Sequence, residues 1–202
     1  MSLHLHHLSF SWPDGTSVVH DLTLDLGPGV HGLVGANGAG KSTLLRLLTA
    51  ELPPSDGTVE VVGTLEVLPQ DPLLGSEHTV SDVLGITGTR AALRAIESGS
   101  TDQADYDAVG DDWDVEQRAV AQLGALGLEH LASGPAGLDR PLDTVSGGEL
   151  VLLALASRLL RRPDVLLLDE PTNNLDVVAR ERVLDAITGL PGTVVVASHD
   201  RS

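Results

Sequence analysis

The sequence predicts an α/β fold: a core of strands and helices, with an antiparallel β segment before it and a helical segment inserted into it. Three observations support this prediction. Two runs near the N-terminus alternate apolar and polar residues, which is the pattern of half-buried strands. Short apolar runs later in the chain are flanked by segments with helical spacing. Between Pro72 and Thr144 the spacing changes to that of helices alone.

The N-terminal elements are two strands joined by a turn. LHLHHLSFSW and VVHDLTLDL both alternate, and Pro13-Asp14-Gly15 lies between them, so the pair predicts a hairpin. The histidines at positions 4, 6 and 7 are not spaced like metal ligands, and we interpret them as strand residues. After a glycine- and proline-containing turn, VHGLV is expected to be a short buried strand that ends at Gly35.

The remaining elements follow from spacing and from helix-breaking residues. A helix is expected from Lys41 through STLLRLLTAEL until Pro53-Pro54 stops it. TVEVVG and TLEVLP are short strands, and a polar, acidic loop around GSTDQADYDAVGDD is expected to separate the helices of the middle segment. A helix from about Gly148 to Arg162, the apolar run VLLLDE, a helix near Asp176 to Thr188 and the strand in TVVVASHD follow.

Length and composition narrow the class of protein. The 202 residues predict one domain, with a core in 1–70 and 146–202 and a helical subdomain in 71–145. The absence of cysteine excludes disulfides and thiolate metal sites, which fits a cytosolic protein. A net charge of −17 argues against a surface that wraps bare nucleic acid, because phosphate binding needs clustered Lys and Arg. No apolar run reaches the length of a membrane span.

The stretch GANGAGKS (35–42) has the context of a phosphate-binding loop, because it follows an apolar strand and opens a helix. Lys41 is the only lysine in a chain that uses arginine at every other basic position, so this position needs a compact ammonium. Lys41 would contact the β- and γ-phosphates, and the Ser42 hydroxyl would bind Mg²⁺. The alternative is a glycine-rich turn with an incidental lysine. The residues expected to bind the nucleotide here are Gly35, Asn37, Gly38, Ala39, Gly40, Lys41, Ser42 and Thr43.

Two further motifs contain candidate catalytic and ligand-binding residues. VLLLDE (165–170) predicts a buried parallel strand with two carboxylates at the end where open α/β sheets bind ligands. Asp169 would hold Mg²⁺ through its water shell, and Glu170 would accept a proton from the attacking water. In TVSGGE, Ser146, Gly147 and Gly148 precede a strong helix and predict a second anion site, although alone they describe an ordinary helix cap.

These motifs together resemble a known family. GANGAGKS, TVSGGE, VLLLDEP and SHD occur in the order and spacing of ATP-binding cassette (ABC) ATPases, and the resemblance covers nearly the whole chain. It implies a P-loop NTPase core with a mixed sheet, an N-terminal antiparallel β-subdomain and an inserted α-helical subdomain. It also implies ATP and Mg²⁺ as cofactors, ATP hydrolysis, and two cassettes that meet head to tail, so that the serine turn of one covers the nucleotide of the other.

The resemblance implies roles for four more residues. Gln70 matches the glutamine that links Mg²⁺ to the helical subdomain, although alone it would be a surface amide. His199 matches the switch histidine that touches the γ-phosphate, whereas an isolated histidine is more often structural. Trp12 stands where the family stacks an aromatic ring on adenine, and the alternative is a core aromatic. Asp176 would cap the next helix and also reach the partner's site.

A more specific resemblance is to the ABC-F group, cytosolic proteins with two cassettes in one chain that act on ribosomes. SGGE in place of SGGQ, DEPTNNLD and the acidic insert around WDVEQR indicate the first cassette of such a protein. Val145 and the lack of a basic residue soon after SGGE depart from the usual pattern. The resemblance implies a cytoplasmic location, no direct membrane insertion, and a continuation past Ser202 into a charged linker and a second cassette.

Three functions remain open at this point. The first is an ATPase module of a ribosome-acting translation or antibiotic-resistance factor, in which segments absent from this sequence contact the ribosome. The second is the ATPase subunit of an ABC membrane transporter. The third is a nucleotide-binding regulatory module with little turnover.

Overall fold

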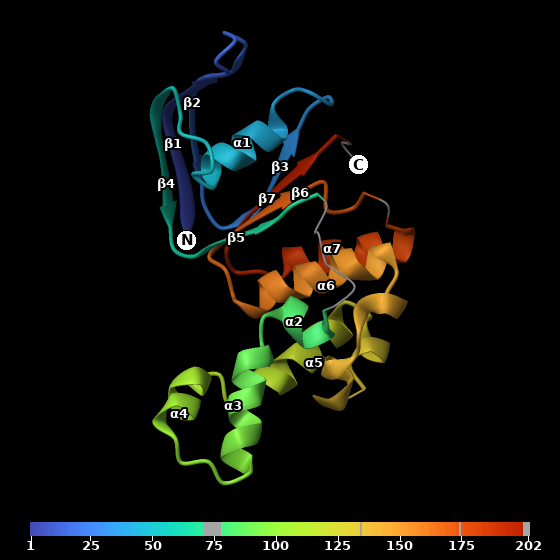
Figure 1. The fold of residues 1–202 in the computed structure, drawn as a ribbon. Coiled ribbons are helices and arrows are strands. Elements are labelled where there is room, and N and C mark those ends of the chain that lie inside the picture. Colours follow the sequence, from blue (N-terminus) through green and yellow to red (C-terminus); the bar gives the residue numbers. More distant parts are fainter. Residues whose placement is uncertain (71–77, 134, 174, 200–202) are drawn as a thin grey trace. The chain divides into compact units, whose positions relative to one another are not determined.

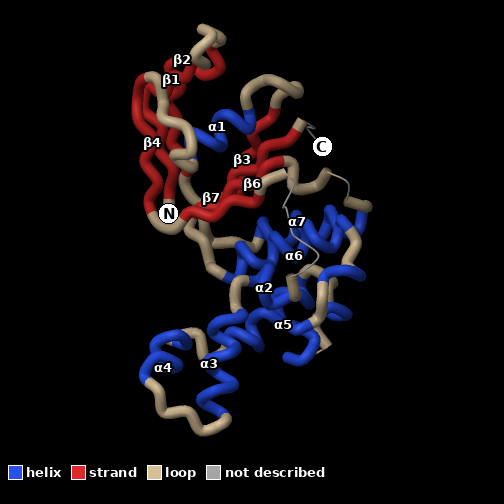
Figure 2. The backbone as a smooth tube through the Cα atoms, viewed as in Figure 1, coloured by secondary structure: helices blue, strands red, loops and turns tan. Residues whose placement is uncertain are grey.

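The computed structural model describes residues 1–70, 78–133, 135–173 and 175–199, and it divides the chain into two compact units. The first unit comprises residues 1–71, 162–175 and 183–202, and the second comprises 72–161 and 176–182. All the described strands belong to the first unit (Figures 1 and 2). This division differs from the expected one at residues 146–161 and 176–182, which group with the helical unit. Residues 146–161 do so because their helix packs against its neighbours there.

An antiparallel sheet forms the N-terminal part of the first unit. It contains β1 (Ser2–Ser11), β2 (Ser17–Leu26) and β4 (Asp56–Val62) in the order β2-β1-β4, so the predicted hairpin is confirmed. Its inward residues, such as Leu3 and Leu5, are fully buried because alternate side chains of a strand face the same side. The three early histidines are strand residues, as predicted.

A parallel sheet forms the rest of the first unit. It contains β3 (Gly29–Val34), β5 (Leu65–Leu68), β6 (Val165–Asp169) and β7 (Thr193–Ser198) in the order β3-β7-β6-β5. The apolar run in β6 lies inside the sheet and is buried, as its composition predicts. The expectation of a buried β3 was wrong. This strand lies at the edge of the described sheet, and Val30 and Val34 are 46% and 45% exposed.

Helix α1 (Lys41–Leu48) lies between the two sheets and contacts β4 and β6 (Figure 1). It buries Leu45, Leu47 and Leu48. The helix ends earlier than expected because Ala50 adopts a positive φ of 57°, which ends helical hydrogen bonding before the prolines are reached.

The second unit is helical. Its elements are α2 (Val80–Leu84), α3 (Thr87–Glu97), α4 (Gln103–Val109), α5 (Val115–Ala125), α6 (Gly147–Leu160), the start of α7 (Val177–Thr188) and the 3₁₀ turns η1 (Glu129–Leu131), η2 (Pro135–Asp139) and η3 (Leu142–Thr144). The expected acidic loop contains α4, and that prediction was wrong. Asp102 caps α4 by accepting a hydrogen bond from the Ala104 N–H, so a polar sequence still begins a helix here. None of the described helices is both long enough and apolar enough to cross a membrane.

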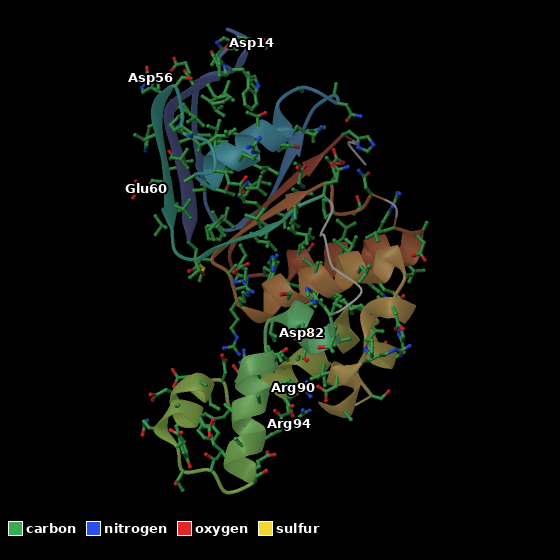
Figure 3. All side chains as sticks on the ribbon, in the orientation of Figure 1. Asp14, Asp56, Glu60, Asp82, Arg90 and Arg94 are labelled. Atoms are coloured by element: carbon green, nitrogen blue, oxygen red, sulfur yellow. The ribbon has the colours of Figure 1, made fainter. Side chains whose placement is uncertain are left out.

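An arginine holds this unit together from within. Arg90 of α3 is 2% exposed, and it donates hydrogen bonds to Glu116 of α5 at 2.7 Å and to Asp139 of η2 at 2.6 Å (Figure 3). Arg94, one turn later, also binds Asp139. The buried guanidinium therefore ties three elements by charge-assisted bonds that replace its lost hydration.

Candidate functional site

The candidate site lies at the carboxyl ends of the strands of the parallel sheet. The loops that follow parallel strands all start from the same edge, so the predicted residues after β3, β5, β6 and β7 are brought together. With the turn between β1 and β2 they line a cavity of about 480 Å³, a size typical of small-ligand sites. Its lining residues all belong to the first unit: Trp12, Thr16, Val18, Asn37, Gly38, Gly40, Lys41, Ser42, Thr43, Gln70, Glu170, Asn173 and His199.

The glycine-rich loop needs its glycines because of its backbone conformation and its close approach to Val18. Gly38 and Gly40 have φ values of 82° and 92°, which side chains rarely adopt. A Cβ on Gly40 would also lie 2.3 Å from a methyl carbon of Val18. The Ala39 N–H closes the turn on the Ala36 carbonyl at 3.1 Å, and Gly40 is the N-cap of α1. The loop thus delivers the chain to a helix N-terminus with unpaired N–H groups and a favourable dipole for anions.

Lys41 is held inside this loop. Its Nζ donates to the carbonyl of Gly35 at 2.9 Å and to that of Ala36 at 3.4 Å, and it lies 3.5 Å from Oε1 of Glu170. The Lys41 side chain is only 9% exposed. A compact ammonium can reach three oxygens in different directions, which a planar guanidinium cannot do in the same space.

Glu170 connects the loop to the end of β7. Its backbone N–H donates to the Ala197 carbonyl at 2.9 Å, and its φ of 50° is uncommon for a residue other than glycine. Its carboxylate uses one oxygen for Lys41 and the other for His199, whose Nδ1 lies 2.9 Å away. Backbone strain at a buried charged residue is typical of functional sites, where the surrounding structure enforces it.

Asp169, directly before Glu170, has an unsatisfied atom. Its Oδ1 is buried and has no hydrogen-bond partner among the residues that the structure describes. A buried carboxylate oxygen is costly without a partner, so this position fits a group supplied from outside the chain. The described residues contain no cluster of three or more histidine or carboxylate side chains that could hold a metal by themselves.

Trp12 borders the cavity and also packs on the core. Its backbone N–H donates to the Thr16 carbonyl at 2.8 Å. This bond closes the predicted turn and places the indole at the cavity. The ring meets Phe10 edge-on, with centroids 5.0 Å apart. The two interpretations of Trp12 are therefore compatible, because a half-buried ring can pack on one side and face a ligand on the other.

The serine turn belongs to the second unit and has its own network. Ser146 is the N-cap of α6, and its N–H and hydroxyl both donate to Oε2 of Glu149, at 2.8 and 2.6 Å. These bonds, with a smaller contribution from His130, hold the pKa of Glu149 below its ordinary value. Gly147 and Gly148 form the first turn of the helix. Asp176 caps α7 as predicted, because it accepts from the Ala179 N–H at 2.8 Å.

Three cavity residues were not predicted. Thr16 and Val18 follow the Trp12 turn, and the spacing of a hairpin could have placed them opposite that tryptophan. Asn173 lies in the turn after Glu170, where its N–H donates to the Glu170 carbonyl at 3.1 Å. Of the predicted site residues of the first unit, Gly35 and Ala39 do not line the cavity but shape the loop, and Asp169 does not line it either. Ser146, Gly147 and Gly148 belong to the second unit. Asn174 and Asp200, which complete the NNLD and SHD motifs, lie outside the described residues.

Comparison with known proteins places the chain in a family. Residues 19–173 match the ABC transporter family. The chain is 39% identical to the tylosin resistance ATP-binding protein TlrC of Streptomyces fradiae, across 98% of this chain and 40% of TlrC. It is 32% identical to the energy-dependent translational throttle protein EttA of Escherichia coli K12, across 98% of this chain and 38% of EttA. The chain thus spans about two fifths of the length of these relatives.

Solved structures give the same result for the fold. A putative metal-chelate type ABC transporter in an inward-facing conformation superimposes with a TM-score of 0.70 at 27% identity, over 98% of this chain and 73% of that one. The ATP-binding subunit of an ABC transporter superimposes with a TM-score of 0.74 at 21% identity, over 98% and 80%. The predicted fold class is confirmed. The chain belongs to the ABC transporter family as an ABC ATPase cassette, and the relatives TlrC and EttA are of the ABC-F type.

Proposed function

We propose that this chain binds Mg-ATP in the first-unit cavity and hydrolyses it as the first of two cassettes of an ABC-F type protein. The observation that carries the proposal is a cavity in which a glycine-rich loop, Lys41, Glu170 and His199 meet. A cation and a buried carboxylate beside a helix N-terminus are what transfer of a terminal phosphoryl group to water requires.

The nucleotide would lie along the loop with its base toward the β1–β2 turn. The N–H groups that begin α1 and the Lys41 ammonium would bind the phosphates, while the Trp12 ring would stack on the base. Lys41 now binds two loop carbonyls and Glu170, so its ammonium must turn toward the phosphates when they enter.

The donor set fits Mg²⁺. Ser42 lies in the first turn of α1, Gln70 lies on the cavity wall, and the Oδ1 of Asp169 is buried without a partner among the described residues. All three supply oxygen, and Mg²⁺ is usually held by one or two protein oxygens together with substrate phosphates and water. When bound, the ion would neutralise charge on the phosphates.

Glu170 would accept the proton of the attacking water, and His199 would position Glu170. Nδ1 of His199 holds one carboxylate oxygen, so the other can turn from Lys41 to a water once the phosphates occupy the lysine. His199 would then contact the γ-phosphate through its exposed edge, since half of its side chain is exposed.

A second cassette would complete the site. We propose that Ser146, Gly147 and Gly148 bind the nucleotide held by a partner cassette placed head to tail, in the same full-length chain. The lengths of TlrC and EttA, about two and a half times that of this chain, support this arrangement. Their names, a resistance protein and a translational throttle, support action on the ribosome in the cytoplasm.

A transporter subunit is the second candidate function. The likeness to the metal-chelate type transporter, at 27% identity, is the observation that favours it. One experiment separates the two candidates: the full-length protein carrying Glu170→Gln is incubated with ribosomes and ATP, then sedimented. We expect co-sedimentation that needs ATP and is lost in the double variant with Lys41→Ala. No ribosome-bound protein, together with co-purification of a membrane subunit, would assign the chain to a transporter.

The ATPase proposal has its own test, which does not depend on the ribosome. Full-length protein should release phosphate from ATP only when Mg²⁺ is present, and Asp169→Asn should raise the Mg²⁺ concentration needed for half-maximal turnover. Turnover that persists in excess EDTA, or an unchanged Mg²⁺ requirement in Asp169→Asn, would contradict the assignment of this site.

A further inference from the structure

The network at the start of α6 extends beyond a helix cap. A capping box uses one carboxylate oxygen, and Oε2 of Glu149 fills that role by accepting from the backbone and hydroxyl of Ser146. The other oxygen, Oε1, lies 2.7 Å from Nε2 of His130. His130 belongs to η1, and its carbonyl accepts a hydrogen bond from Arg140 at 3.2 Å. The orientation of the Ser146 hydroxyl is therefore set by a carboxylate that is itself held from its far side.

The charge of Glu149 creates a difficulty for an anion site. The carboxylate lies in the first turn of α6, beside the N–H groups that would face a triphosphate. Its lowered pKa keeps it ionised, so it repels an approaching phosphate and also retains the hydroxyl proton of Ser146. Asp143, in the 3₁₀ turn η3, adds an acidic residue shortly before Ser146 in the sequence, and Glu129 directly precedes His130. His130 contacts the carboxylate directly, and it adds a positive charge there when its ring is protonated.

We propose that His130 is a positioning residue of the serine turn. By binding Oε1 it keeps the Glu149 carboxylate at the capping position and, when protonated, offsets its charge, so that Ser146 can turn its hydroxyl to the nucleotide of a partner cassette. This inference rests on the proposed function and adds to it a residue outside every motif of the sequence. The exposed pair is worth little to folding, since half of the His130 side chain is exposed, so its effect should appear in turnover.

The test is a double-mutant cycle in the full-length protein. His130→Ala should lower kcat about three- to fivefold, the size of an exposed charge-pair coupling, with KM for ATP unchanged. His130→Arg, which restores a donor and a charge, should return kcat to within about twofold of wild type. In the Glu149→Gln background, His130→Ala should have an effect below about twofold, because the charge that it compensates is gone. His7→Ala is the matched control, since His7 forms an exposed 2.6 Å pair with Asp21 on the antiparallel sheet.

A second readout does not depend on turnover. In the 202-residue chain, the pKa of the Glu149 carboxyl, measured by carbon NMR, should rise in His130→Ala. Four outcomes would each overturn the inference. They are an unchanged Glu149 titration, a His130→Ala enzyme with wild-type kcat, an Arg variant no better than Ala, and a His130 effect that persists in Glu149→Gln. If the wild-type protein shows no ATPase activity that Glu170→Gln removes, the proposed function is refuted instead. The Glu149 titration would then test the pairing of His130 with Glu149 by itself.

Discussion

Glu170→Gln should change three properties of this chain in different directions. The substitution keeps the size of the side chain and one acceptor oxygen but removes the negative charge that faces Lys41 at 3.5 Å and His199 at 2.9 Å. We expect lower stability without nucleotide, tighter binding of Mg-ATP, and loss of hydrolysis in the full-length protein. Each effect follows from the same charge.

The magnitudes can be worked from the geometry. At 3.5 Å and an effective dielectric constant of about 20, the Lys41–Glu170 attraction is about 5 kcal/mol before desolvation is counted. Desolvation offsets most of this attraction, so the net loss of stability should be about 1–3 kcal/mol, typical of a hydrogen bond to a charged group. Without nucleotide, Lys41 is then released from Glu170, and a triphosphate no longer meets that carboxylate. We expect roughly tenfold tighter binding, equivalent to about 1.4 kcal/mol.

The assays are urea unfolding and titration calorimetry with Mg-ATP on this chain, and phosphate release by the full-length protein. Loss of the general base should lower kcat by ~10²–10⁴-fold. Glu60→Gln is the matched control, because it makes the same charge change at an exposed position on β4 (Figure 3). Weaker binding of Mg-ATP in Glu170→Gln, or turnover within twofold of wild type, would refute the reasoning.

Four further predictions rest on single features. Lys41→Ala should abolish ATP binding and Lys41→Arg should weaken it severely, as calorimetry would measure; an Arg variant that binds like wild type contradicts the geometry of three oxygens around one ammonium. Arg90→Met should cost about 3–5 kcal/mol in urea unfolding, because it removes the buried cation from Glu116 and leaves Asp139 to Arg94. Arg118→Met, at a more exposed pair of carboxylates, should cost at most about 1 kcal/mol, and equal losses would contradict the role of burial. Hydrogen bonds, first from the Thr87 hydroxyl, lower the pKa of Asp82 to about 2 from 3.8, so its contribution to stability is present above pH 3.8 and lost as the pH falls toward 2. The difference in unfolding midpoint between wild type and Asp82→Ala should therefore shrink from pH 6 to pH 2, and a constant difference would contradict this. The isolated chain should hydrolyse ATP very slowly, because a partner's serine turn supplies donors whose loss costs ~10²–10³-fold each; a monomer in gel filtration with full-length turnover would disprove this composite site.

The sequence was most informative about the residues that follow the parallel strands. Gly35, Gln70, Glu170 and His199 each follow an apolar strand, and parallel strands place such residues at one edge whatever the loops do. The structure brings their loops to one cavity for that reason. The motif spacing therefore predicted most of the residues that line the cavity, but not Thr16, Val18 or Asn173.

What the sequence did not predict depends on specific side-chain contacts and on strand pairing, which composition does not encode. Helix α4 forms in an acidic stretch because the Asp102 side chain caps it, and local composition alone favoured a loop. The exposure of β3 depends on which strand pairs beside it, and a run of five residues carries no such information. The strained φ of Glu170 and the pairing of His130 with Glu149 likewise come from tertiary packing.

The two proposed anion sites share an arrangement that bears on the proposed mechanism. In the first unit Lys41, which the phosphates need, is bound to the carboxylate of Glu170. In the second unit the Ser146 hydroxyl, which a partner's nucleotide needs, is bound to the carboxylate of Glu149. In each site a carboxylate of the chain therefore occupies the donor before the ligand does, and a histidine holds that carboxylate from its other oxygen. An entering phosphate would replace a carboxylate of like charge as the acceptor. This exchange costs less free energy than leaving the donor without any acceptor. Phosphate binding at either proposed site would then release a carboxylate, and we propose that the one released at the first site, Glu170, acts on water.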